Sequence, residues 1–445
     1  MTSVNHPVRI VIVGGGYVGM YTALRLQKRL SRGAADITVI EPQANMTYQP
    51  FLPEAAAGSV EPRHVVVPLR RVLSRCTVLT GAASRIEHAR KVVLVQPAEG
   101  DAYEVGYDLL VVCPGSISRA LPIPGLAEHG VGFKTIGEAI YLRNHVLSCL
   151  DLAASTQDPD RRRRALTFVF VGGGYAGVEA MAELEDMARY ATRYLPGIEP
   201  EQMRWVLVEA ASRIMPEVSV RLSAYTVDRL TERNIDVRLD TRLESAVDGR
   251  VRLSDGDEFE AETLVWTAGV KANPMLRDTD LPLDDAGRLS CRADLTVKGV
   301  NGVFAAGDCA AVPDLTKSDP NALCSPSAQH AVRQAKRLAD NIVATVRGDA
   351  LREYRHAYAG SVASLGLYRG VAEIYGIRLR GFPAWWMHRT YHVSRMPTFN
   401  RKVRVIADWT GALIFRREVV SLGQLQQPRS EFELAAGRRR LPEVS

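Results

Sequence analysis

Three glycines at a fixed spacing follow an apolar run near the N-terminus. Residues 8–13 are mostly β-branched, and Gly14, Gly16 and Gly19 come directly after them as G-x-G-x-x-G. The first glycine permits a tight turn, the second lets the backbone approach a pyrophosphate, and the third lets a helix pack close to the strand. Glu41 ends the next apolar run, where its carboxylate can accept a hydrogen bond from a ribose hydroxyl. The spacing predicts a dinucleotide-binding unit.

The same arrangement occurs a second time in the middle of the chain. Gly172, Gly174 and Gly177 follow another apolar run, and Glu209 ends the run after it. Two such cradles predict two dinucleotides, and a hydride that passes between them would explain why both are present. The alternative is a duplicated unit that has lost its ligand in one copy, but both copies keep the acid. Glu209 also favours NADH over NADPH, since a 2′-phosphate would meet a carboxylate, unless Arg213 turns toward that phosphate.

A third motif places an acid after a short apolar run. Residues 302–308 read Gly-Val-Phe-Ala-Ala-Gly-Asp and end in Asp308. Together with the segments that end in Gly115 and Gly269, they resemble the crossover and return motifs of the two-dinucleotide-binding flavoproteins. The resemblance covers residues 8–365 and implies an FAD domain interrupted by an NAD(P)H domain. It places FAD in the N-terminal cradle, with Asp308 against its ribityl–pyrophosphate; the alternative for Asp308 is a helix N-cap or a turn acid.

The cysteines exclude one branch of these flavoproteins. The disulfide reductases carry a redox cysteine pair on the helix after the first acid, but residues 41–54 contain no cysteine, and the six cysteines of the chain form no C-x-x-C pair. Dithiol chemistry needs two thiols within disulfide reach. Electrons are therefore expected to leave the flavin directly, for a diffusing acceptor or a protein carrier. Sulfide:quinone oxidation fits poorly for the same reason.

Two further segments, residues 48–58 and 172–184, resemble the type II NADH dehydrogenases, which are single-subunit NADH:quinone oxidoreductases that pump no protons. The resemblance implies FAD and NADH as cofactors and a membrane quinone as acceptor, with menaquinone expected. In that family the glutamate that matches Glu179 lies beside the nicotinamide and the flavin. We expect Glu179 in the first turn of the helix after the second cradle, where the helix dipole favours a carboxylate. The alternative is a surface glutamate that only complements the dipole.

The expected quinone site departs from this family at one position. The family has Ala-Gln followed by a second glutamine four residues later, whereas this chain has Gln329 and then Arg333, and Gln334 falls on another helix face. Gln329 is expected to contact the flavin ring or a quinone carbonyl. Arg333 could bind a quinone oxygen or the negative charge that develops on a quinone, or it could pair with a nearby acid.

Composition narrows the class of protein. The chain has 445 residues, of which 46% are hydrophobic and 24% charged, as in ordinary globular enzymes. No run approaches the roughly 18 apolar residues of a membrane-spanning helix, and no secretory signal is apparent, so we expect a protein of the cytoplasmic side. No metal-ligand cluster stands out among the nine histidines and six cysteines. The net charge of +6 is concentrated after residue 366, which indicates a local anionic partner.

Aromatic and basic side chains mix in the C-terminal part. Trp385, Trp386, Arg389 and Arg395 lie in the segment 381–417. Such a mixture suits an interfacial amphipathic element on anionic lipid. The type II resemblance likewise implies a peripheral, monotopic enzyme that docks on the cytoplasmic face of the cell membrane through this region. The alternatives are a domain cap or a homodimer interface; no nucleic-acid-binding module accompanies the charge.

Strands and helices that alternate must position these residues. We expect an α/β fold with two Rossmann-like dinucleotide-binding domains, the NADH domain inserted in the FAD domain, and a small C-terminal membrane-docking segment. The helices that would carry the motifs are residues 20–30, 328–346 and 383–397. The expected FAD domain is residues 1–120 and 288–365, the NADH domain is residues 121–287, and the C-terminal region is residues 366–445.

Two other functions stay open on the sequence alone. One is a soluble NAD(P)H-dependent flavin reductase that passes electrons to a ferredoxin-like iron–sulfur protein, which a basic patch could dock. Docking of such a protein would not explain the adjacent tryptophans Trp385 and Trp386. The other is a non-enzymatic flavoprotein in which NADH binding controls a partner, and slow turnover with every acceptor would favour it.

Overall fold

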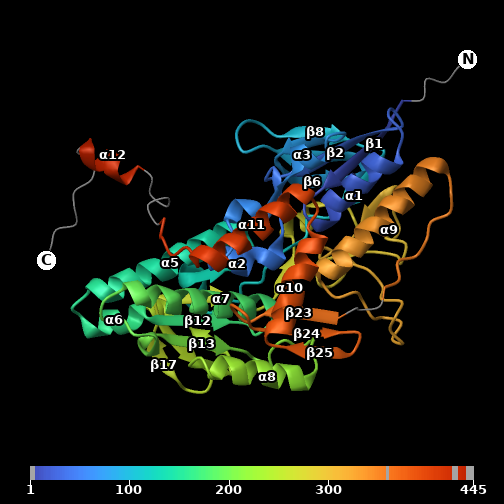
Figure 1. Cartoon of the computed structure of the whole chain (residues 1–445). Coiled ribbons are helices and arrows are strands. Elements are labelled where there is room, and N and C mark those ends of the chain that lie inside the picture. The colour runs from blue at the N-terminus through green and yellow to red at the C-terminus, as the bar shows by residue number, and fades with distance from the viewer. Residues whose placement is uncertain (1–5, 357–359, 423–428, 437–445) are drawn as a thin grey trace, which may run out of the picture. The chain divides into compact units, whose positions relative to one another are not determined.

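A computed structural model describes residues 6–356, 360–422 and 429–436 of the chain (Figure 1). The chain divides into two compact units. The first consists of residues 1–48, 66–119 and 269–359, and the second of residues 49–65, 120–268 and 360–445. Each unit contains a five-stranded parallel sheet that includes the strand before one of the two glycine motifs, as the expected pair of Rossmann-like domains requires.

The unit boundaries differ from the expected ones at three points, namely residue 269, residues 49–65 and residue 360. The chain returns to the first unit at residue 269 rather than 288, because β19 (Val270–Ala272) pairs antiparallel with β10 (Ser116–Ser118). The C-terminal residues from 360 onward belong to the second unit together with residues 49–65, instead of forming a separate region from 366. The basic residues at 438–440 of the expected C-terminal region lie outside the described residues.

The sheet of the first unit has the strand order β21-β9-β1-β2-β5, and all its pairs are parallel. Its central strands β1 and β9 carry buried runs of Val, Ile and Leu, as sheets covered on both faces do. Helices α1 and α9 pack side by side in this unit (Figure 1). These elements are β1 (Val8–Val13), β2 (Ala35–Glu41), β5 (Thr77–Thr80), β9 (Leu109–Val112), β21 (Val303–Ala305), α1 (Tyr17–Arg29) and α9 (Ala328–Arg347).

Smaller elements complete the first unit. A three-stranded antiparallel sheet, β6-β7-β8, and two short ribbons, β3-β4 and β20-β22, accompany the main sheet. Their bounds are β3 (Asn45–Thr47), β4 (Val66–Pro68), α3 (Leu69–Val72), β6 (Ala82–Glu87), β7 (Val92–Gln96), β8 (Tyr103–Gly106), β20 (Leu289–Ser290) and β22 (Ala310–Ala311).

The sheet of the second unit has the order β11-β18-β12-β13-β14, again all parallel. Its core stacks Trp205 on Phe168 with ring centroids 4.3 Å apart. The elements are β11 (Gly130–Gly132), β12 (Thr167–Val171), β13 (Arg204–Val208), β14 (Ile235–Arg238), β18 (Thr263–Trp266), an antiparallel sheet of β15 (Leu243–Ser245), β16 (Arg250–Leu253) and β17 (Glu258–Glu260), and the helices α2 (Leu52–Ala56), α4 (Leu126–His129), α5 (Ile136–Ser155), α6 (Pro159–Ala165), α7 (Tyr175–Ala191) and α8 (Val220–Thr231).

The C-terminal part of the second unit is a small sheet with two helices. β23 (Gly360–Ser364), β24 (Gly370–Ile374) and β25 (Ile377–Arg380) form an antiparallel sheet, against which α10 (Phe382–Arg395) packs (Figure 1). Next in the chain comes α11 (Phe399–Phe415), and α12 is Ser430–Ala435. The expected helices are confirmed within a few residues. None of the helices in the described ranges is long and apolar enough to cross a membrane.

Candidate functional site

The first cradle combines two tightly packed glycines with one that faces open space. Gly14 has φ +103°, and a Cβ added there would lie 2.3 Å from the carbonyl oxygen of Cys113. A Cβ on Gly19 would lie 1.8 Å from the carbonyl oxygen of Gly14. A Cβ on Gly16 would meet no heavy atom within 4 Å, and this residue is the N-cap of α1. The backbone is therefore exposed where an anion at the helix N-terminus would approach, so the residues fit a pyrophosphate.

Glu41 closes the glycine loop from the next strand. Its Oε2 accepts the N–H of Gly15 at 2.6 Å, and its Oε1 accepts the N–H of Gln43 at 3.3 Å. Burial raises the pKa of the Glu41 carboxyl, although both N–H groups oppose that shift. A carboxylate has about four acceptor sites, so Glu41 retains the capacity to bind a ribose hydroxyl as well.

The second cradle repeats this geometry. Gly172 has φ +114°, and a Cβ on it would lie 2.7 Å from Thr267, whereas a Cβ on Gly174 would meet nothing within 4 Å. A Cβ on Gly177 would lie 2.0 Å from the carbonyl oxygen of Gly172. Glu209 accepts the N–H of Gly173 at 2.6 Å with Oε2 and the N–H of Ala211 at 2.8 Å with Oε1. Both cradles are thus built for the same ligand chemistry.

The Gly-Asp motif lies at the end of β21 in the first unit. The Asp308 carboxylate accepts a hydrogen bond from the Ser116 hydroxyl at 2.6 Å. Asp308 is not the N-cap of the helix that follows, because Ser327 fills that position and accepts the N–H of His330. Gly115 and Gly269 have φ +72° and +92°, and a Cβ on either would meet no heavy atom within 4 Å. The motif therefore leaves open space beside a carboxylate.

Gln334 contacts the Gly-Asp motif, and this contact was not predicted from the sequence. Its side-chain Oε1 accepts the N–H of Gly307 at 2.7 Å, next to Asp308. Gln334 does point to another face than Gln329, as expected, but that face is the buried one. The sequence does contain a signal for a buried role of Gln334, because this residue lies in the apolar stripe formed with Ala331 and Leu338. A polar side chain in a buried stripe needs a partner.

Gln329 and Arg333 share one face in the first turns of α9. The Arg333 guanidinium donates to the backbone carbonyl of Gln329 at 3.1 Å, and the Gln329 side-chain oxygen lies 3.2 Å from Nε2 of His356. Both residues are half-buried. Within the described residues, Arg333 forms no ion pair with a carboxylate, so the structure does not bear out the alternative of a nearby acid. Burial and the Arg333 charge together lower the pKa of His356.

Glu179 lies deeper than expected. It is the fifth residue of α7 and belongs to the second turn rather than the first, and it is buried rather than on the surface. Its Oε1 accepts the N–H of Ser364 at 2.8 Å and lies 3.2 Å from Nε2 of His388 on α10. Burial alone would lower the pKa of His388, but the Glu179 carboxylate outweighs burial and raises it. The pair can therefore hold a proton inside the second unit.

The aromatic and basic residues expected at a lipid surface are partly internal. Trp385 and Arg389 are buried, and the Arg389 guanidinium lies 3.2 Å from Oε2 of Glu54 and 4.1 Å from the centre of the Trp385 ring. Trp409 donates its indole N–H to Glu54 at 2.6 Å. Arg417 is also buried and pairs with Glu183 at 2.8 Å. A desolvated Arg binds a carboxylate with a planar fork and stacks on aromatic rings, which explains this use.

α11 instead exposes its apolar residues. Phe399 is 82% exposed and Phe415 is 83% exposed, and further apolar side chains between them are exposed as well. Only Val405 of this helix is buried among the described residues. The exposed apolar residues of the helix, named here the α11 stripe, are Phe399, Val403, Ile406, Leu413, Ile414 and Phe415.

Thiol and metal chemistry find no support in the described part of the chain. The cysteines are all free, and burial raises the pKa of the Cys324 thiol to about 11, so this residue is a neutral packing group rather than a reactive one. No group of three or more His, Cys, Asp or Glu side chains there could hold a metal ion.

Comparisons with known proteins find relatives along most of the chain. A family model described as pyridine nucleotide-disulphide oxidoreductase matches residues 8–335. The type II NADH:quinone oxidoreductase Ndh of Mycobacterium tuberculosis is 30% identical over 424 residues, which cover 92% of this chain and 89% of that protein. The type II NADH:quinone oxidoreductase of Staphylococcus aureus is 28% identical over 385 residues, with 86% and 93% covered. NDH2 from Plasmodium falciparum, solved with NADH, has a TM-score of 0.85 at 17% identity, covers 93% of this chain and 99% of its own, and shows the fold alone.

Proposed function

We infer the details of the reaction from one premise: this chain belongs to the pyridine nucleotide-disulphide oxidoreductase family and, among its members, to the type II NADH:quinone oxidoreductases. It is an FAD-dependent enzyme that transfers electrons from NADH to a quinone. When bound, FAD supplies the redox chemistry, since it can take a hydride from NADH and give two electrons to a quinone. The residues of the chain bind and orient the reactants and hold charge and protons near them.

The two cradles carry this proposal. Each has an open second glycine and a glutamate hydrogen-bonded to its glycine loop. We assign FAD to the first cradle, where the Gly-Asp motif, Gly115 and Gly269 belong to the same unit. Its residues are Gly14, Gly16, Gly19, Glu41, Gly115, Gly269 and Asp308.

We assign NADH to the second cradle, with Gly172, Gly174, Gly177 and Glu209. A 2′-phosphate near Glu209 would be repelled at close range, which favours NADH over NADPH. Arg213 does not offset this repulsion, because its guanidinium donates to the carbonyl oxygens of Val218 at 3.0 Å and Pro216 at 2.6 Å.

Glu179 is proposed as the catalytic carboxylate beside the nicotinamide. The Ser364 N–H fixes its orientation, and the contact with His388 lets the pair store one proton without leaving a lone buried charge. His388 acts through Glu179 and is a positioning residue.

Gln329 and Arg333 are proposed as the quinone-binding groups. The Gln329 amide can donate to or accept from a quinone oxygen, and the Arg333 cation can stabilise negative charge as electrons arrive. We propose menaquinone as the acceptor. The side chain of His356, bonded to Gln329, keeps that amide oriented.

The α11 stripe is proposed to dock the enzyme peripherally on the cytoplasmic face of the cell membrane. Large exposed apolar side chains on a helix insert into the interfacial region of a bilayer, and basic groups such as Arg404 and Arg416 beside them favour anionic lipid. A homodimer that covers the same face is the competing arrangement.

The acceptor is tested with purified, FAD-containing enzyme and NADH. Initial rates are compared with menadione, ubiquinone-1 and a ferredoxin as acceptors. The proposal expects the highest kcat/KM with menadione. Preferred turnover with ubiquinone-1 would contradict the menaquinone assignment, and preferred turnover with the ferredoxin would favour the soluble reductase.

A further inference from the structure

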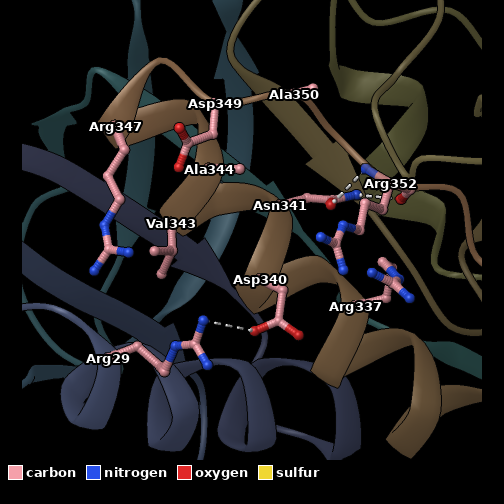
Figure 2. A pocket seen from close by; sticks show the side chains of 10 residues that line it. All are labelled: Arg29, Arg337, Asp340, Asn341, Val343, Ala344, Arg347, Asp349, Ala350 and Arg352. Carbon is pink, nitrogen blue, oxygen red and sulfur yellow. Dashed lines mark hydrogen bonds and ion pairs between the residues drawn. The ribbon is translucent and has the colours of Figure 1, made fainter.

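A pocket of about 500 Å³ lies at the C-terminal ends of α1 and α9 in the first unit. It is formed by the last turn of α1, one face of α9 and the segment 349–352 that follows α9. Figure 2 shows four guanidinium groups around the same space and two aspartates that extend into it. The N-terminal ends of both helices, by contrast, carry residues assigned to the cofactor and quinone sites. The charged residues are Arg29, Arg337, Asp340, Arg347, Asp349 and Arg352.

The lining holds four guanidinium groups and only two carboxylates, those of Asp340 and Asp349, so the acids offset only part of the positive charge. Asp340 is occupied by Arg25, whose Nε and Nη2 each lie 2.9 Å from one carboxylate oxygen, and Arg29 reaches Asp340 only at 3.8 Å. The guanidinium groups of Arg337, Arg347 and Arg352 form no hydrogen bond or ion pair with any described residue. The pocket therefore has an excess of positive charge in the part of the chain before residue 366, where basic side chains are otherwise not in excess.

The wall that carries Arg352 is fixed in place. Asn341 is only 1% exposed, and its amide donates to the carbonyl oxygens of Asp294 at 2.7 Å and Arg352 at 2.8 Å. Its Oδ1 accepts the N–H of Arg352 at 3.0 Å. The buried Asn341 side chain thus fixes the backbone N–H and carbonyl of Arg352, and with them the point from which the Arg352 side chain extends. A fixed backbone at this point lowers the entropy cost of binding an anion there.

We propose that this pocket binds the phosphate chain of an oligophosphate, such as that of a nucleotide. Guanidinium groups bind phosphate oxygens with two parallel hydrogen bonds. The helix dipole explains the cation in the last turn of α9, which is Arg347. It does not explain Arg337, in the middle of the helix, or Arg352, which lies beyond its end. The volume exceeds that of one phosphate ion, and no aromatic ring lines the pocket for a base to stack on. Recognition is therefore of the phosphates and not of the base.

Binding would stabilise the first unit. The anion would bridge α1, whose N-terminal end forms the Gly16 cradle, and α9, whose Gln334 holds the Gly307 loop. The two helices already share the Arg25–Asp340 ion pair near the pocket. An anion that ties their far ends together should raise the unfolding temperature of this unit as ligand is added.

The test is calorimetric titration of the FAD-containing enzyme saturated with NAD⁺, so that ATP and adenosine do not enter the second cradle, without quinone and at fixed ionic strength. Tripolyphosphate and ATP should bind with dissociation constants below about 1 mM and within about threefold of each other, since no base contact exists, and adenosine should not bind. Arg337→Gln/Arg352→Gln should weaken tripolyphosphate binding at least about tenfold, as expected for lost charge-assisted hydrogen bonds. The control Arg221→Gln/Arg242→Gln removes the same charge from exposed sites of the second unit and should leave binding unchanged.

The unfolding temperature, followed by FAD fluorescence, should rise with tripolyphosphate in the wild type and in the control but not in the pocket variant. If both double variants weaken tripolyphosphate binding equally, the binding depends on the overall charge of the protein, and the proposed site is wrong. No heat of binding above that of added NaCl would also overturn it, and so would tight binding of adenosine.

Discussion

Gly16 and Gly19 lie three positions apart in the sequence, but the space around their Cα atoms differs. A methyl group on Gly16 would enter open space, whereas one on Gly19 would overlap the Gly14 carbonyl oxygen at 1.8 Å. Gly174 and Gly177 repeat this contrast in the second cradle. The spacing of the motif is enough to predict this steric contrast, because the requirement at each glycine arises within its own turn. The partner of a side chain such as His388 could not be predicted, since it depends on a residue far away in sequence.

Gly16→Ala should fold but bind FAD at least about tenfold more weakly, because its methyl group occupies the place of a pyrophosphate contact. Gly174→Ala should keep FAD and raise the KM for NADH instead. The FAD content per chain and the KM of purified variants measure this. Gly19→Ala is the matched comparison, since its clash should destabilise the first unit by about 1–3 kcal/mol. Full FAD content in Gly16→Ala would refute the assignment of the first cradle.

Glu209→Gln should narrow the preference for NADH over NADPH. The amide oxygen can still accept one loop N–H, but the carboxylate that repels a 2′-phosphate is gone. The ratio of kcat/KM for the two cofactors measures the change, and Glu41→Gln in the other cradle serves as control because it should not move that ratio. A wild type that prefers NADPH would show that Glu209 does not face the ribose.

The Glu179–His388 pair predicts a pH dependence of stability. Because the folded-state pKa of His388 is raised, the stabilisation is fully present below the unfolded value of about 6.5 and is lost as the pH rises through the folded value. His388→Gln should therefore cost on the order of 3 kcal/mol at pH 6 and progressively less toward pH 8. The groups that face His388 are Glu179, Glu54, Arg389 and His392.

Chemical denaturation of the wild type, His388→Gln and Glu179→Gln at three pH values checks this pair. Both variants should show the same flattened trend, since each removes one partner. A cost of His388→Gln that grows with pH would mean that His388 is neutral in the folded protein.

The helices could be predicted from their periodicity and caps. The expected helix 328–346 is observed as Ala328–Arg347, capped by Ser327 and ended by Gly348 in a left-handed conformation. The orientation of α10 was harder to predict from the sequence. Its aromatic and basic residues could either face lipid or pack inside the protein against an acid. Glu54, which binds both Arg389 and Trp409, is more than 300 residues away in sequence, and no local pattern reports that contact.

The α11 stripe is tested by Phe399→Ser/Ile406→Ser/Phe415→Ser. This variant should lose most of its binding to phosphatidylglycerol vesicles, at least about tenfold, because each large side chain contributes about 1.5–3 kcal/mol on leaving water. Sedimentation with vesicles measures it, and binding of the intact protein should weaken as salt screens the basic groups. The control Tyr375→Ser/Ile377→Ser changes exposed apolar residues of the β24–β25 hairpin and should bind as the wild type does. A stripe variant that keeps vesicle binding but changes oligomeric state would assign this face to a dimer.

The duplicated motif predicted the two sheets but not the point where the chain returns to the first unit. β10 and β19 form a ribbon of three residue pairs, which is too short to leave a periodic signal, and this ribbon brings the chain back at 269. The assignment of residues 49–65 to the second unit likewise depends on contacts of α2 with α5 and α7. Local sequence patterns contain little information about which short, distant segments pair with each other.

We propose that NADH bound in the second cradle reduces FAD, and that reduced FAD is reoxidised by a quinone bound at the Gln329–Arg333 end of α9. Anaerobic rapid mixing tests this claim most directly, because the absorbance of bound FAD separates reduction by NADH from reoxidation by menadione. Arg333→Gln, which restores the family pattern, and Arg333→Ala should change the rate of reoxidation and leave the rate of reduction nearly unchanged; Gly174→Ala should slow only the reduction. If both Arg333 variants leave reoxidation by menadione at the wild-type rate, the quinone is reduced elsewhere and the claim is contradicted.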